Sequence, residues 1–396
     1  MRFATLTRQP DDPLLRIIGQ HGADPRPDKI DLGVGVFRDE AGHTPVMTAV
    51  KAAEARLLAE QSSKSYLGPE GDIGFVRALA GLVIGDTVAA ERIVGLQTPG
   101  GTGALRLAAE VLARAGVAKI WIGSPSWANH APLFRQAGVE PALIPCFDLN
   151  SQTFDLNGFL AGLTGAAAGD AVLLHGCCHN PIGIDPDAAG WAAIAQDVAA
   201  RDLLPVVDLA YQGLGDGFDV DAEGARTILA AVPEALLAYS CDKNFGLYRE
   251  RTGALFALSP DRDTGAVVFS NLLALARANW SMPPDHGAAI VRIILEDEGL
   301  TAEWRDELET MRQRLESLRA ALAAGGRIGA IDLGAVAHGK GMFATLPLSP
   351  SQVEWLRDRH GIYMAGSGRI NIAGFNTTAI GRFHDALRDM AANGVA

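Results

Sequence analysis

The chain has 396 residues, of which 48% are hydrophobic and 20% are charged, and this balance excludes an intrinsically disordered or fibrous protein. Its formal net charge of −12 argues against a nucleic-acid partner, because contacts to phosphate groups along a strand need a basic surface. The four cysteines are too few for a disulfide framework and favour a reducing compartment.

The N-terminal sequence lacks the apolar core of a secretory signal peptide. No stretch approaches the roughly 18 consecutive apolar residues that a membrane span needs. We therefore expect a cytoplasmic protein that does not enter a membrane.

Strand and helix patterns alternate along the middle of the chain. In chain order they are a helix at 103–116, strands at 119–123 and 171–176, a helix at 187–202, and strands at 203–210, 235–240 and 253–258. This alternation predicts an α/β fold with a mainly parallel sheet between helices, which binds ligands at the carboxyl ends of its strands. A long amphipathic helix at 303–325 and short strands at 341–346 and 368–374 then predict a smaller α+β domain.

A glycine-rich turn leads into the helix at 103–116. Backbone N–H groups of Gly100 and Gly101, with the hydroxyl of Thr102, would form an anion site at the positive end of that helix. The alternative is a flexible turn in which Thr102 only caps the helix.

Polar residues also follow three of the expected strands. The segment HGCCHNPIGID (175–185) fits zinc poorly, because its cysteines are adjacent, so we predict no metal site; it presents Asn180 at the sheet edge. Asp208 ends an apolar strand and needs a cationic partner unless it caps a helix, and Tyr211 follows it. Lys243 follows the next strand.

Arg249 and Arg251 lie close behind Lys243 in the sequence. A lysine held among cations and partly desolvated has the lowered pKa that Schiff-base chemistry requires, although an ordinary surface lysine is the alternative. Together, a lysine, a strand-end carboxylate and an anion cradle match the needs of pyridoxal 5′-phosphate.

The chain resembles the aspartate/aromatic aminotransferase family of fold-type I pyridoxal-phosphate enzymes. The segments that carry the resemblance are DLGVGVFRDEAG (31–42), SYLGPEG (65–71), TPGGTGALR (98–106), PSWANH (125–130), HGCCHNPIG (175–183), DLAYQG (208–213), KNFGLYRERTG (243–253) and SGRINIAG (367–374). The resemblance implies an N-terminal arm with part of the small domain at 1–42, a large cofactor-binding domain at 43–305 and a small C-terminal domain at 306–396.

The resemblance also implies roles at the cofactor. Lys243 is similar to the lysine that binds the cofactor aldehyde and moves the substrate proton, Asp208 to the partner of the ring nitrogen, and His130 to the imidazole that supports that aspartate. Asn180 and Tyr211 resemble the pair that contacts the ring oxygen, and Trp127 the residue stacked on the ring. The residues similar to the phosphate cradle are Gly101, Thr102, Ser240 and Arg251, joined by Tyr66 of a neighbouring subunit.

At the substrate, Arg369 resembles the guanidinium that binds the α-carboxylate, helped by the backbone at Gly35. Arg277 resembles the arginine that reaches from the partner subunit to a side-chain carboxylate. Trp127 and Asn180 also face the substrate. Because Tyr66 and Arg277 would act across the interface, the resemblance implies a homodimer with shared sites. The implied reaction is ping-pong transfer of an amino group from an aromatic amino acid or aspartate to 2-oxoglutarate.

Two other functions stay open at the level of sequence: a decarboxylase or lyase reaction on the same fold, and a ligand-binding regulator without catalysis. Two positions also depart from the family or vary within it. Asp242 stands where the family usually has a serine that contacts phosphate, so its carboxylate should repel phosphate unless it turns away or pairs with an arginine. Met282 makes the site entrance more apolar, which weakly favours aromatic donors.

Overall fold

The computed structural model describes residues 2–8 and 13–395. Its α-helices are α1 Pro13–Ala23, α2 Thr48–Glu60, α3 Ile73–Val83, α4 Gly100–Arg114, α5 His130–Ala137, α6 Leu156–Gly162, α7 Ala188–Ala200, α8 Glu223–Ala231, α9 Arg262–Asn279, α10 Asp285–Glu296, α11 Glu298–Ala323, α12 Pro350–His360 and α13 Thr377–Ala392. Its strands are β1 Ile30–Asp31, β2 Ile93–Pro99, β3 Lys119–Ser124, β4 Glu140–Pro145, β5 Phe147–Asp148, β6 Thr153–Phe154, β7 Ala171–His175, β8 Leu204–Leu209, β9 Ala235–Ser240, β10 Thr252–Leu258, β11 Arg327–Ile328, β12 Ile331–Asp332, β13 Phe343–Thr345, β14 Ile362–Tyr363 and β15 Arg369–Asn371.

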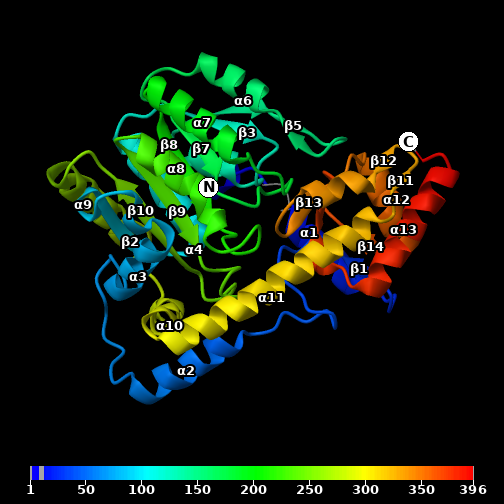
Figure 1. The fold of residues 1–396 in the computed structure, drawn as a ribbon, viewed down its shortest axis with the longest axis horizontal. Coiled ribbons are helices and arrows are strands. Elements are labelled where there is room, and N and C mark those ends of the chain that lie inside the picture. The colour runs from blue at the N-terminus through cyan, green and yellow to red at the C-terminus, as the bar shows by residue number, and fades with distance from the viewer. Residues whose placement is uncertain (1, 9–12, 396) are drawn as a thin grey trace.

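A seven-stranded sheet forms the centre of the larger part of the molecule (Figure 1). Its order is β2-β10-β9-β8-β7-β3-β4, and only β10 runs antiparallel to its neighbours. The expected α/β fold with a mainly parallel sheet is confirmed.

Apolar side chains alternate between the two faces of this sheet. On β8, Val206 packs in the core that includes Leu105 of α4, whereas Val207 packs in the core that includes Ile194 of α7 and Ile228 of α8. Because successive side chains of a strand point to opposite faces, a sheet covered on both sides reads as a continuous apolar run. This explains why the central strands were recognisable from the sequence.

The structure extends or shortens several predicted elements. Helix α11 begins at Glu298 and not at residue 303, because the Asp297 side chain accepts hydrogen bonds from the backbone of Gly299 and Leu300 and caps the helix there. Strand β4 carries two prolines and lies at the edge of the sheet, where a missing N–H is tolerated. Because of these prolines, the sequence pattern does not predict a strand here.

The N-terminal and C-terminal segments meet in a second, smaller part. Strand β1 pairs in parallel with β14, and β13 pairs antiparallel with β15. Helix α11 runs from α2 and α10 to this part as one continuous element (Figure 1), and it passes residues 305 and 306 without a break. The division into 1–42, 43–305 and 306–396 stays a prediction.

Arg319 of α11 is fully buried where this helix meets the smaller part. Its guanidinium donates to the carbonyl oxygens of Val336 at 3.1 Å, Lys340 at 2.7 Å and Gly341 at 3.2 Å, and to that of Phe343. One side chain thereby fixes the whole segment that leads into β13.

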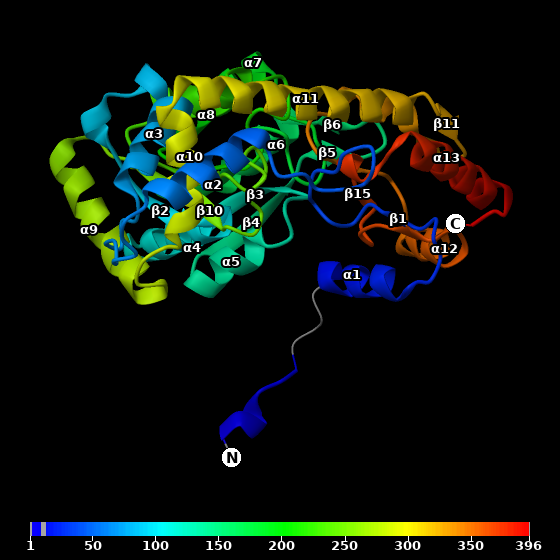
Figure 2. The same cartoon turned by 90° about the horizontal axis from the view of Figure 1, so that it is seen from below.

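Seen from below, the short helical turn at Arg2–Thr5 lies away from the rest of the chain (Figure 2). Its Phe3 side chain is 86% exposed. Among the described residues, none of the helices combines the length and the apolar character needed to cross a membrane.

Candidate active site

A cavity of about 260 Å³ opens at the carboxyl ends of the parallel strands. Asn180 reaches it from the loop after β7, Asp208 from the end of β8 and Lys243 from the turn after β9. The predicted site residues that line it are Gly35, Gly101, Thr102, Trp127, Asn180, Asp208, Tyr211, Ser240, Lys243 and Arg369. The structure thus brings together residues that are up to 334 positions apart, from Gly35 to Arg369.

Lys243 lies inside the cavity and not at the surface. Its Nζ is 3.9 Å from Oδ2 of Asp242 and 5.4 Å from the centre of the Tyr211 ring. Burial lowers the pKa of Lys243, while the charges of Asp242 and Asp208 oppose that change. A lysine with a lowered pKa supplies more of the neutral amine that attacks an aldehyde.

Asp208 is held by a chain of hydrogen bonds. Its Oδ2 is 3.1 Å from Nε2 of His130, whose Nδ1 is 2.8 Å from Oγ of Ser126, and this hydroxyl is 2.9 Å from Nε2 of His175. Burial raises the pKa of Asp208, but the hydrogen bond from His130 and the nearby positive charges outweigh it and lower the pKa overall. The carboxyl group therefore stays ionised.

Sequence reasoning missed Ser126 and His175 as members of this chain. Both lie inside segments that carried the resemblance, PSWANH and HGCCHNPIG, but their role depends on the packing of α5 against the sheet. Burial lowers the pKa of His175 to about 3, so this imidazole is neutral and exchanges hydrogen bonds without adding a charge.

Asn180 and Tyr211, which the resemblance assigns to the ring oxygen of the cofactor, are in contact with each other. The Asn180 amide nitrogen donates to the Tyr211 hydroxyl at 3.2 Å. Burial raises the pKa of Tyr211, which keeps the phenol neutral. The Oδ1 atom of Asn180 is buried and has no hydrogen-bond partner among the described residues, so an acceptor at the cavity wall is free for a ligand.

The glycine-rich turn does start a helix. Gly100 has φ +70°, a conformation that side-chain-bearing residues rarely adopt, and it is the first residue of α4. An ideal Cβ on Gly101 would lie 3.0 Å from Cβ of Ser240, which is tighter than an ordinary contact, so glycine eases the close approach of the two segments. Gly101 and Thr102 line the cavity in the first turn of α4, where an anion site would lie.

Asp242 pairs with an arginine, which was one of the two alternatives for this departure from the family. Its Oδ2 accepts from Nη1 of Arg251 at 2.5 Å. Arg251 itself does not line the cavity, whereas Asp242 does.

Arg369 projects from β15 into the same cavity. Its guanidinium lies 4.9 Å from the centre of the Phe343 ring, and its Nη2 donates to the Gly33 carbonyl at 2.7 Å. Its Nε is buried without a hydrogen-bond partner among the described residues. An ideal Cβ on Gly35 would lie 2.8 Å from Cζ of Phe343, which explains the glycine. Phe343 is a wall residue that sequence reasoning missed.

Besides His130 and Arg251, which contact Asp208 and Asp242, two further predicted site residues do not line the cavity of their own chain. Tyr66 is 93% exposed and lines a separate hollow of about 1040 Å³, together with Met282. Arg277 is exposed near the end of α9, where it donates to the Ser281 hydroxyl. The roles assigned to both depend on a second copy of the chain.

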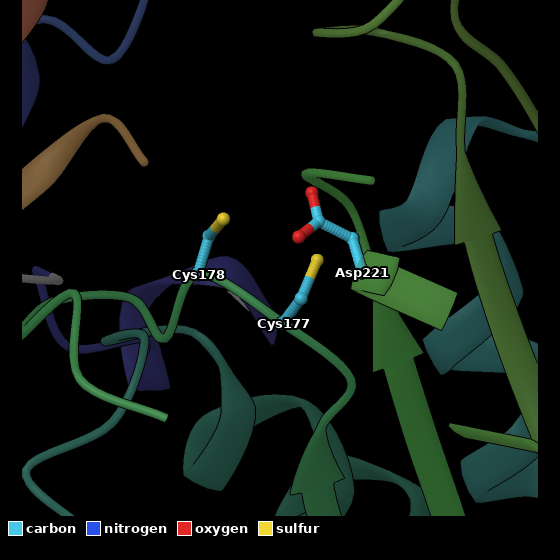
Figure 3. Close-up of side chains that lie close together, drawn as sticks. All are labelled: Cys177, Cys178 and Asp221. Carbon is cyan, nitrogen blue, oxygen red and sulfur yellow. The ribbon is translucent and has the colours of Figure 1, made fainter. Parts of the chain in front are cut away.

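Cys177, Cys178 and Asp221 form the one group with metal-ligand chemistry in the described part of the chain, with ligand atoms within 4.8 Å of one another (Figure 3). The Asp221 carboxylate already accepts hydrogen bonds from the backbone of Gly213, Gly215 and Asp216. Burial raises the pKa of Cys177, which opposes the thiolate that a metal needs. These contacts favour a structural role.

The chain matches the family model for aminotransferase class I and II over residues 27–387. It is 56% identical to a tyrosine aminotransferase of Rhizobium meliloti, over 95% of this chain and 96% of the relative, and 42% identical to an aspartate aminotransferase of Escherichia coli, over 94% and 96%. A solved aromatic-amino-acid aminotransferase from Burkholderia pseudomallei, covalently bound to pyridoxal phosphate, superposes with a TM-score of 0.94 at 37% identity, over 99% of this chain and 100% of that one.

Proposed function

The chain belongs to the class I and II aminotransferases and uses pyridoxal 5′-phosphate, and on that premise we propose that it moves the amino group of an aromatic amino acid or aspartate to 2-oxoglutarate. The observation that carries the proposal is the convergence of Lys243, Asp208 and Arg369 on one cavity. A lysine, an ionised carboxylate and a guanidinium there match an aldehyde, a protonated ring nitrogen and a substrate carboxylate.

The cavity fits this cofactor by its unsatisfied polar atoms. Asn180 Oδ1, Asp242 Oδ1 and Arg369 Nε are buried without a partner among the described residues, and all three residues line the cavity. Buried polar atoms normally have hydrogen-bond partners, so the wall is built for a polar ligand. Lys243, Asp208, Asn180, Tyr211, Trp127, Gly101, Thr102, Ser240 and Arg251 would hold the cofactor.

When bound, pyridoxal 5′-phosphate supplies an electron-poor ring that makes the proton on the substrate Cα acidic. Lys243, with its lowered pKa, would take that proton on Nζ and donate it again in the next proton transfer. Asp208, kept ionised by His130, would hold the ring nitrogen in its protonated form. Tyr211 and Asn180 would orient the ring oxygen.

Substrates would be held through their carboxylates. Arg369 would bind the α-carboxylate that all amino acids and 2-oxo acids share, with Gly35 close by. Release of one oxo acid before the next enters gives the ping-pong order, because both use the same guanidinium.

We further propose a homodimer in which Tyr66 and Arg277 complete the partner's site. The exposure of these two residues supports the homodimer, because both side chains lie at the surface and outside the cavity of their own chain. A cytoplasmic location is supported by the four cysteines, all of which are buried and free.

The decisive experiment is to fix the cofactor with borohydride and map the labelled peptide. We expect the label on Lys243, and Lys243→Ala should abolish both the label and turnover with phenylalanine and 2-oxoglutarate. Lys51→Ala, whose side chain is 63% exposed on α2, is the matched control and should change neither. A label on another lysine would refute the assignment.

A comparison of kcat/KM for aspartate and phenylalanine then identifies the preferred donor. A 2-oxoglutarate-dependent half-reaction separates a transaminase from a decarboxylase or lyase.

A further inference from the structure

One carboxylate oxygen of Asp242 has a hydrogen-bond partner and the other has none among the described residues. The residue is 5% exposed, and its Oδ2 accepts from Arg251 Nη1 at 2.5 Å. Its Oδ1 is buried and has no hydrogen-bond partner among the described residues, although Asp242 lines the cavity. A buried carboxylate oxygen without a donor is costly, so this atom points to a ligand that carries a proton.

The guanidinium of Arg251 is already partly engaged, so it is not wholly available to bind an anion. Its Nη1 donates to both Asp242 and, at 3.1 Å, the Tyr248 carbonyl, which uses both of its N–H groups. Its Nη2 lies on the side of α4, 2.7 Å from an ideal Cβ on Gly100. The guanidinium therefore joins Asp242 to the start of α4, and a phosphate placed there shares it with a carboxylate.

We propose that Asp242 makes this cradle selective for a phosphate group that keeps one proton. The hydroxyl of the monoanion would donate to Asp242 Oδ1, while its other oxygens would accept from Arg251 and from N–H groups at the start of α4. The inference rests on the proposed function, which places the cofactor phosphate here. A phosphate monoester loses its second proton in water with a pKa of about 6, and a neighbouring carboxylate disfavours the second charge.

The other charged and titratable groups around Asp242 do not replace this effect. They are Lys243 and Cys241 on the same turn, Tyr248 in the following turn, Arg251 immediately before β10 and Asp208 on β8. Burial raises the pKa of Tyr248 to about 12 and raises that of Cys241, so both are neutral near pH 7. The charge of Asp242 opposes the lowering of the Lys243 pKa by burial, so both Asp242 variants should also lower the pKa of Lys243.

The direct test is the ³¹P resonance of the holoenzyme as a function of pH. In the wild type the resonance of the bound phosphate should lie at the position of the monoanion near pH 7. If it titrates, it should do so at a pH at least about one unit above that of the free cofactor. In Asp242→Ser and Asp242→Asn the resonance should lie at the dianion position near pH 7.

Asp263→Ser removes an exposed carboxylate on α9 and controls for net charge; it should behave as the wild type. A wild-type resonance that is fixed at the dianion position, as in the variants, would overturn the proposal.

The second test is the affinity of the apoenzyme for pyridoxamine 5′-phosphate, which forms no covalent bond with Lys243. Above pH 6 the wild type must bind the monoanion, whose fraction of the free cofactor falls as the pH rises. Its Kd relative to that of Asp242→Ser should therefore rise about tenfold per pH unit until the bound phosphate itself titrates. A ratio that does not change with pH, or loss of binding by both variants at every pH, would overturn the proposal.

The two proposals fail in different ways. If borohydride fixes the cofactor to Lys243 but the phosphate is a dianion, only the role of Asp242 is wrong. If the cofactor is not fixed to Lys243, the proposed function itself is wrong.

Discussion

Replacing Arg369 by lysine tests how this chain would read its substrates. The guanidinium of Arg369 already donates through Nη2 to the Gly33 carbonyl at 2.7 Å, and its buried Nε has no hydrogen-bond partner in the described part of the chain. A lysine keeps the charge but has one nitrogen, so it cannot hold Gly33 and bind a carboxylate through two parallel hydrogen bonds.

The size of the effect follows from the contact that is lost. One hydrogen bond to a charged group contributes about 1.5–3 kcal/mol, which corresponds to about a 10- to 160-fold fall in kcat/KM. Because the α-carboxylate is common to all donors, aspartate and phenylalanine should lose the same factor. Cofactor binding should not change, since Arg369 is not among the residues expected to hold it.

The assay is steady-state kinetics with both donors and 2-oxoglutarate, together with the absorbance of the bound cofactor. Arg388→Lys, an exposed position on α13 with 57% of its side chain accessible, is the matched control. A loss of less than threefold, or a loss confined to one donor, would refute the reasoning.

Two further substitutions and one labelling experiment test other parts of the molecule. Arg277→Leu should depress kcat/KM for aspartate by orders of magnitude while sparing phenylalanine, because an unpaired side-chain carboxylate in the site costs about 3–5 kcal/mol; equal losses would contradict its role. Ser126→Ala leaves His130 Nδ1 without its partner at 2.8 Å, so the protein should lose about 1–3 kcal/mol of stability in thermal or urea unfolding, and an unchanged melting temperature would argue against the hydrogen-bond chain. Cys177 and Cys178 should resist alkylation in the native protein at pH 8. A hydrogen bond from Cys177 lowers the pKa of Cys178, but burial outweighs it and raises this pKa to about 11. Labelling of the native protein as fast as that of the urea-unfolded protein would contradict this expectation.

Sequence patterns predicted the sheet because its central strands are apolar on both faces, as Val206 and Val207 of β8 show. They could not predict β4, whose prolines are tolerated only because it is an edge strand. The extent of α11 was also missed at its start, since the cap formed by Asp297 precedes the amphipathic pattern.

The site divides in a similar way. Residues at strand ends, such as Asp208 and Lys243, could be found because topology alone brings them to one edge. Ser126 and Phe343 could not, because their contacts depend on how α5 and β13 pack against the sheet. The partner of Asp242 was left open for the same reason: only the fold of the turn before β10 puts Arg251 within 2.5 Å.

The buried guanidinium of Arg319 has a consequence for how specificity can evolve in this chain. It holds the carbonyl of Phe343, and the ring of Phe343 lies 4.9 Å from the guanidinium of Arg369. Substitutions along α11 or in residues 336–342 can therefore shift the wall that faces the substrate without changing any residue that lines the cavity. Mutational drift on the remote side of this helix is a route to new donor preferences that leaves the chemical groups intact.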